Sequence, residues 1–147
     1  MTGSLTHDDA REIIRRAVEK SIEVQWISAY AVVDECGNLI SVSRVDNAPA
    51  AAVPMACSKA YLAAVTGRNT LAHAEHVEAF TIRHDAYQRV LKKPLFPGPG
   101  AAAIVRDGKL VGGFSSSVSS HGKGMKLRVE GGAVLSRADI VTAYALQ

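Results

Sequence analysis

The spacing of hydrophobic residues in the first part of the chain predicts a helix. Between residues 8 and 24, apolar positions recur every three or four residues, which is typical of an amphipathic helix. These positions are Ala10, Ile13, Ile14, Ala17, Val18 and Ile22. Thr6 precedes the pattern and is suited to cap the first turn of the helix. We expect this helix to pack against the core with one face only.

Two later stretches follow a pattern typical of β-hairpins. Residues 26–33 are rich in β-branched and aromatic side chains and predict a largely buried strand. Residues 34–38 form a turn in which Gly37 and Asn38 are both able to adopt positive φ, and residues 39–45 form the return strand. Residues 101–106 and 109–114 flank Asp107-Gly108, a strong short-range hairpin signal, and predict the second hairpin.

The remaining segments predict further helices and one more strand. Residues 50–66 form an alanine-rich helix, with Pro54 in its first turns and Gly67 at its C-terminal end. This helix is apolar on most sides, so we expect it to be buried on more than one face. Residues 70–91 are mostly helical, and residues 92–100 form a Pro/Gly loop. Residues 126–135 predict a strand interrupted by glycine, and Ser136 caps a terminal helix.

The order of these elements predicts the fold class. Hairpins, rather than β-α-β crossovers, indicate an antiparallel sheet. We therefore predict a single α+β domain over residues 1–147, with helices packed on a sheet built from two hairpins. A chain of 147 residues is long enough to bury a core of its own.

Composition and charge narrow the classes of function. Apolar residues make up 48% of the chain but aromatic residues only 5%, which predicts a core of small aliphatic side chains rather than large rings. The net charge is +3, yet the basic residues are scattered, so we predict no nucleic-acid binding.

The termini and the cysteines indicate a protein of the cytoplasm. No signal peptide or transmembrane run is visible in the sequence, so we expect a cytoplasmic protein without a membrane partner. Cys36 and Cys57 do not form a disulfide framework. We expect Cys36 to be exposed in a turn, and Cys57 to be a small buried apolar residue.

Several motifs resemble those of the GlcG/HbpS-like haem-binding family, which includes the C-terminal domain of the PduO corrinoid adenosyltransferase. Residues 31–49, AVVDECGNLISVSRVDNAP, are similar to the family hairpin VVD-x-x-G-x-L with its R-x-D-x-A-P exit. Residues 58–70, SKAYLAAVTGRNT, resemble its K-A-x-T-A helix. Residues 97–114, PGPGAAAIVRDGKLVGGF, resemble its later hairpin. With the opening helix, the resemblance covers residues 5–116.

The resemblance implies an antiparallel sheet flanked by helices and assembly into dimers or larger homo-oligomers. It also implies binding of haem or another tetrapyrrole, because family members are associated with such ligands. Residues 117–147 depart from the family pattern, and Pro-Gly-Pro-Gly stands where Pro-Gly-Gly is common. Ligand contacts from that part of the family therefore cannot be carried over.

Polar residues around the end of the second strand are candidates for ligand binding. Arg44, Asp46 and Asn47 lie at the strand end, while Lys59 and Arg68 belong to the following helix and its exit. A helix N-terminus beside a strand end favours an anion, and arginine binds carboxylates through a bidentate fork. The alternative is a surface ion pair between Arg44 and Asp46, with Asp46 capping the helix.

Three histidines are candidates for ligating haem iron or a metal ion. His73 and His76 are three residues apart on a predicted helix and so share a face, and His84 follows eight residues later. The alternative is that they are solvated helix residues, because no second set of metal-binding side chains accompanies them.

Two functions from different classes follow. The first is a small oligomeric protein that binds haem, another tetrapyrrole or a planar carboxylated ligand. The second is a cofactor-independent enzyme, an isomerase, hydrolase or lyase of a catabolic pathway. In that enzyme Arg44 would hold a small carboxylate, and a histidine, Asp34 or Asp46 would move protons.

Overall fold

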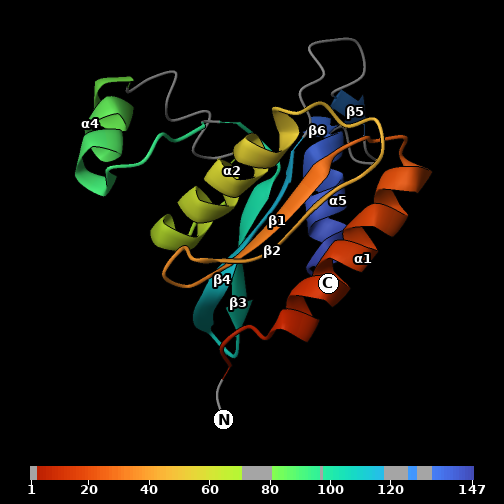
Figure 1. The fold of residues 1–147 in the computed structure, drawn as a ribbon, viewed down its shortest axis with the longest axis horizontal. Helices are drawn as coiled ribbons and strands as arrows, with labels where there is room; N and C mark the ends of the chain where they lie inside the picture. Colours follow the sequence, from red (N-terminus) through yellow and green to blue (C-terminus); the bar gives the residue numbers. More distant parts are fainter. Residues whose placement is uncertain (1–2, 71–80, 97, 118–125, 129–133) are drawn as a thin grey trace.

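A four-stranded antiparallel sheet lies between two layers of helices (Figure 1). The computed structural model of the chain describes residues 3–70, 81–96, 98–117, 126–128 and 134–147. The strands lie in the order β2 (Leu39–Arg44), β1 (Ala29–Asp34), β4 (Lys109–Ser117) and β3 (Ala101–Arg106). Helix α2 (Ala52–Thr66) covers one face, and α1 (His7–Glu23) and α5 (Arg137–Ala145) cover the other. The predicted α+β class and both predicted hairpins are confirmed.

Helix α1 begins with the predicted cap. The Thr6 hydroxyl accepts a hydrogen bond from the Asp9 backbone N–H at 3.1 Å, and the Asp9 carboxylate accepts one from the Thr6 N–H at 2.8 Å. This reciprocal capping box satisfies two backbone donors that the first helical turn leaves free. The buried residues of α1 lie along one stripe and face the sheet; they are Ala10, Ile13, Ile14, Ala17 and Ser21.

The first hairpin is shorter than predicted. Strand β1 starts at Ala29, not at residue 26, because Gln25 takes a positive φ of 55° and the Trp26 N–H bonds to the Ser21 carbonyl. Residues 24–26 therefore follow the last turn of α1 and do not belong to β1. At the turn Gly37 adopts the predicted positive φ, whereas Asn38 does not.

Helix α2 packs closely on the sheet. It starts at Ala52, slightly later than predicted, and ends at Gly67, which takes the expected left-handed conformation. Its alanines pack on Ala29, Ala31 and Val33 of β1. At Gly113 of β4 an added Cβ would lie 2.3 Å from the Ala60 carbonyl oxygen, so the absence of a side chain there permits this close approach.

The remaining described elements are one helix and two short strands. Helix α4 (Thr81–Leu91) is the described part of the helix predicted over residues 70–91, and in Figure 1 it lies outside α2, away from the sheet. The strand predicted over residues 126–135 is two short antiparallel strands, β5 (Lys126–Arg128) and β6 (Val134–Ser136). No helix within the described ranges is long and apolar enough to cross a membrane.

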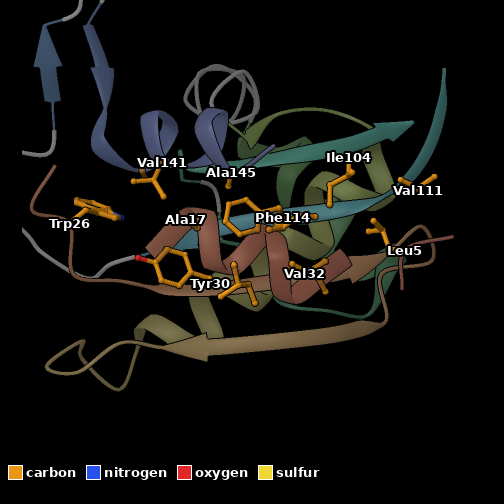
Figure 2. Packing of buried hydrophobic residues seen from close by; sticks show 14 residues of the cluster. Leu5, Ala17, Trp26, Tyr30, Val32, Ile104, Val111, Phe114, Val141 and Ala145 are labelled. Atoms are coloured by element: carbon orange, nitrogen blue, oxygen red, sulfur yellow. The ribbon is translucent and has the colours of Figure 1, made fainter. Parts of the chain in front are cut away.

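The core differs between the two faces of the sheet. On the α2 face it is built from alanines, as the composition predicts. On the α1 and α5 face, Tyr30 and Phe114 stack with their ring centroids 6.4 Å apart, and Trp26 is also buried there. Figure 2 shows these rings among Ala17, Val141 and Ala145. The prediction of a core without large rings is therefore wrong for this face.

Candidate functional site

A groove runs along the outer side of α2, between the β1–β2 turn and the segment that follows α4. It has a volume of about 410 Å³. This lies within the range of small-molecule sites, at its lower end. Its lining is mostly apolar and consists of Val33, Gly37, Asn38, Leu39, Pro54, Cys57, Ser58, Tyr61, Lys93 and Pro94. We call it the α2 groove.

The Tyr61 ring forms one wall of the α2 groove and is fixed from two sides. It packs against the β1–β2 turn so closely that a Cβ at Gly37 would lie 2.4 Å from the ring. On the other side Lys93 Nζ lies 4.2 Å from the ring centroid, a cation–π contact. The groove thus presents an aromatic side chain with an ammonium group beside it.

Hydrogen bonds of Ser58 hold the segment after α4 against α2. The Ser58 hydroxyl donates to the Pro94 carbonyl at 3.1 Å and accepts from the Phe96 N–H at 2.9 Å. These bonds place Lys93 and Pro94 at the groove, although they lie more than thirty residues from Ser58 in the chain. The wall is therefore made by two segments that only the tertiary structure brings together.

Cys57 contributes a thiol to the α2 groove. It is half-buried rather than fully buried, so the prediction of a purely structural cysteine is wrong in that respect. Burial raises the pKa of the Cys57 thiol. The free thiol is therefore neutral near pH 7. Cys36, as predicted, is exposed.

The structure divides the predicted polar cluster. Arg44, Asp46 and Asn47 are exposed where β2 ends, and within the described ranges none of them forms a hydrogen bond or an ion pair through its side chain. Asp46 does not cap α2, whose N-cap is Ala51. Arg68 follows the far end of α2, a helix of 15 residues and so about 22 Å long. Asn47 and Arg68 therefore lie at opposite ends of this helix.

Lys59 lies inside the molecule rather than in the groove. It is only 3% exposed, and its Nζ donates to the carbonyls of Pro99 at 2.7 Å and Ser116 at 3.1 Å. Burial lowers the pKa of Lys59 to about 7, although the Asp139 carboxylate acts in the opposite direction.

A second hollow lies beside Asp46, with a volume of about 470 Å³. Its lining comes from the end of α1, the start of β1 and the exit of β2, and consists of Val18, Ser21, Ile22, Gln25, Trp26, Ile27, Tyr30, Val45 and Asp46. These lining residues include no cationic side chain and no sulfur or imidazole. The hollow therefore offers no cation for an anionic ligand and no sulfur or imidazole for a metal ion, whereas the lining of the α2 groove includes Lys93 and Cys57.

Only one of the three candidate histidines lies within the described residues. His84 is buried, and its Nε2 lies 3.2 Å from the Leu95 carbonyl oxygen. His73 and His76 lie outside the described residues. Among the described residues, no three side chains of the metal-binding types gather into a metal site. Iron ligation by these histidines stays a prediction.

Sequence reasoning missed Tyr61 and Lys93 and assigned Cys57 to the interior. One signal was present, since Cys57 and Tyr61 are four residues apart and share a face of α2. Because alanines occur on most sides of α2, the sequence did not show which face of the helix points to the sheet. The position of Lys93 had no local signal at all.

Three solved structures have the same fold and align over most of this chain. A PduOC–haem complex aligns with a TM-score of 0.74 and 20% identity, covering 98% of this chain and 94% of that one. Protein ORFY of Klebsiella pneumoniae aligns with a TM-score of 0.75 and 16% identity, covering 99% and 90%. A double mutant of HbpS from Streptomyces reticuli aligns with a TM-score of 0.72 and 21% identity, covering 99% and 84%.

The comparison of the sequence with family models identifies the family. No curated protein matches the chain. The family model described as "Haem degrading protein HbpS-like", however, matches residues 5–141, which is most of the sequence. The predicted departure of residues 117–147 from the family pattern stays a prediction. This chain belongs to the HbpS-like family.

Proposed function

We propose that this protein is a haem-binding accessory protein and that the α2 groove holds the tetrapyrrole. The observation that carries the proposal is the meeting of Cys57, Tyr61 and Lys93 in one mostly apolar groove. The family description and the haem complex of PduOC support haem as the ligand.

The residues of the groove fit the chemical parts of haem. Cys57 offers sulfur, one of the protein ligands that hold haem iron. The apolar lining and the Tyr61 ring suit a flat hydrophobic macrocycle. Lys93 offers an ammonium group for a propionate. When bound, haem would supply redox chemistry at its iron, while the protein residues hold and orient the ring.

Haemin titration of the purified protein tests this proposal. We expect a shifted Soret band that saturates at a fixed ratio of haemin to protein. Cys57→Ser should alter the position of the band and weaken binding by roughly tenfold or more, as expected if the Cys57 sulfur would hold the iron. Cys36→Ser is the matched control, because Cys36 is exposed and does not line the groove; it should leave the spectrum unchanged.

Two results would overturn this assignment. An unshifted Soret band would remove haem as the ligand. A spectrum unchanged in Cys57→Ser but lost in His73→Ala or His76→Ala would move the iron ligand from the groove to the helix predicted over residues 70–91. The enzyme alternative has no support among the described residues, where the Arg44 side chain is paired with no acid or base.

We also propose that the protein self-associates through α4. Ile82, Ala86 and Val90 are four residues apart and form one stripe on this helix. The Ile82 side chain is 87% exposed and that of Val90 is 78% exposed. Because α4 leads directly into the segment that carries Lys93, a second copy packed on this stripe would lie beside the α2 groove. The added surface would cover more of a macrocycle than a 410 Å³ groove covers alone.

A further inference from the structure

The inner side of α2 carries a polar cluster that the proposed haem site does not use. Its residues are Lys59 of α2, Ser115 and Ser117 of β4, and Asp139 of α5, whose carboxylate acts on Lys59. Lys59 is two residues beyond Cys57 and therefore about 200° around the helix from it. The cluster and the α2 groove lie on opposite sides of the same helix.

Lys59 is buried without a paired carboxylate. Its Nζ donates to two backbone carbonyls, those of Pro99 and Ser116, and it forms no ion pair with any carboxylate of the described residues. A buried ammonium group is unfavourable unless a negative charge accompanies it. The Asp139 carboxylate acts on Lys59 at longer range, while its Oδ1 accepts a hydrogen bond from the Gly100 N–H at 2.9 Å.

Two buried serine hydroxyls on the sheet face under α2 lack hydrogen-bond partners within the described residues. Within the described part of the chain, the buried side-chain atoms without a partner are Ser115 Oγ, Ser117 Oγ and Arg137 Nε. Ser115 pairs with Ala31 and Ser117 with Ala29, two residues that pack under α2, so both hydroxyls lie on the sheet face that α2 covers. Buried polar atoms are normally satisfied, so two unpartnered hydroxyls on this face indicate a missing hydrogen-bond partner.

Gly100 shows that these elements meet at one place. A Cβ at Gly100 would lie 3.3 Å from Lys59 Nζ, 2.5 Å from the Ser116 carbonyl oxygen and 2.6 Å from the Ala138 Cβ. Its φ of +102° and its hydrogen bonds to α5 hold the chain in this position. One bond runs to Asp139, and the other comes from Thr142 Oγ1 to the Gly100 carbonyl at 2.8 Å.

We propose that this cluster binds a small monocarboxylate, with Lys59 and the hydroxyls of Ser115 and Ser117 as its donors. A serine hydroxyl can donate or accept, whereas the Lys59 ammonium group can only donate, so an acceptor would satisfy all three groups at once. The ammonium form of Lys59 carries one positive charge, and no carboxylate of the described residues forms an ion pair with it. A monocarboxylate balances that charge, whereas a dianion would leave an excess negative charge buried.

This site is independent of the haem proposal. It shares no residue with the lining of the α2 groove. A change that empties one site is therefore expected to leave the other functional, and the two proposals can fail separately.

Sodium formate and sodium acetate are the probes, with sodium chloride at equal ionic strength as the control. Backbone amide NMR at about pH 6 should show saturable shifts at Gly100, Ser116 and Ser117 with formate or acetate, and none with chloride. The double variant Ser115→Ala/Ser117→Ala should weaken the affinity roughly tenfold or more, and Lys59→Met should abolish saturable binding. Haemin binding should be unchanged in the double variant.

The pH dependence of binding provides a readout that identifies the lysine. Because the pKa of Lys59 is about 7 in the free protein, binding that requires the ammonium form should weaken roughly tenfold per pH unit above that value. The charged group of α5 that acts on Lys59 is Asp139, and the facing residues of β4 are serines.

Three results would overturn the proposal. Absence of saturable shifts with both formate and acetate would indicate that ordered water alone satisfies the donors. Undiminished affinity in the serine double variant would remove the hydroxyls as donors. An affinity that does not depend on pH between about 6 and 9 would exclude the Lys59 ammonium group as a donor to the ligand. This test holds even if Lys59→Met fails to fold.

Discussion

At the scale of single residues, Lys59 shows how burial changes chemistry. The side chain is 3% exposed, and burial lowers the pKa from 10.5 to about 7 despite the opposing effect of Asp139. Between these two values the unfolded chain binds a proton that the native chain does not. The free energy of unfolding therefore rises with pH through this window, and below about pH 7 both states carry the proton.

We predict that Lys59→Met removes this pH dependence. In the native protein Lys59 should contribute a slope of up to roughly 1.4 kcal/mol per pH unit between about pH 7 and pH 10. Urea unfolding at a series of pH values gives the free energy of unfolding for each variant. The difference between the original protein and Lys59→Met should grow across that window. Lys93→Met, at an exposed lysine, is the control and should run parallel to the original protein.

Parallel pH profiles for the original protein and Lys59→Met would contradict this account. They would mean that the lysine keeps an ordinary pKa in the folded state. Such a result would also remove the basis for the pH readout of monocarboxylate binding.

At the scale of elements, the approach of α2 to the sheet depends on small residues on both sides. Alanines of α2 face Ala29 and Ala31 of β1 and Gly113 of β4. A Cβ at Gly113 would lie 2.3 Å from the Ala60 carbonyl oxygen and 3.0 Å from the Ala64 nitrogen, both backbone atoms. Backbone atoms cannot rotate away as a side chain can, so the helix itself would have to shift.

We therefore predict that Gly113→Ala destabilises the protein by about 3 kcal/mol, at the upper end of typical overpacking costs. Gly108→Ala is the control, because an added Cβ there meets nothing within 4 Å although φ is +75°. Its expected cost is about 1 kcal/mol, from the left-handed backbone alone. Chemical denaturation measures both. Equal losses for the two variants would show that α2 tolerates displacement from the sheet.

At the scale of the whole molecule, the proposed self-association gives a direct prediction. The original protein should sediment as a dimer or larger species that dissociates on dilution. Ile82→Glu/Val90→Glu places two charges on the exposed stripe of α4 and should give a monomer at all concentrations. Sedimentation velocity measures this, and circular dichroism checks that the variant stays folded.

Ile22→Glu is the matched control for the α4 variant. Ile22 is 76% exposed, but it lies on α1 in the other helical layer. Assembly should therefore be unchanged in this variant. A monomeric original protein, or loss of assembly only in Ile22→Glu, would exclude α4 as the interface.

The sequence by itself determined the features that depend on neighbours in the chain. The capping box of Thr6 and Asp9 joins residues three apart, and the turn at Asp107-Gly108 joins adjacent strands, so each could be predicted from a short stretch. The class of the sheet followed from those turns. The motifs of residues 31–49, 58–70 and 97–114, together with the opening helix, also indicated the family, which the family model confirms.

The tertiary structure alone decided where the chemistry lies. Alanines occur on most sides of α2, so its sequence did not reveal that Lys59 faces inward while Cys57 and Tyr61 line a groove. Lys93 contacts the Tyr61 ring although the two residues are 32 positions apart in the sequence. No local sequence pattern predicts such a contact. Arg68 was predicted to lie near Arg44, but it follows the C-terminal end of α2. The length of this helix separates the two residues. Local backbone preferences fix turns and caps, whereas the partners of a side chain depend on how distant elements pack.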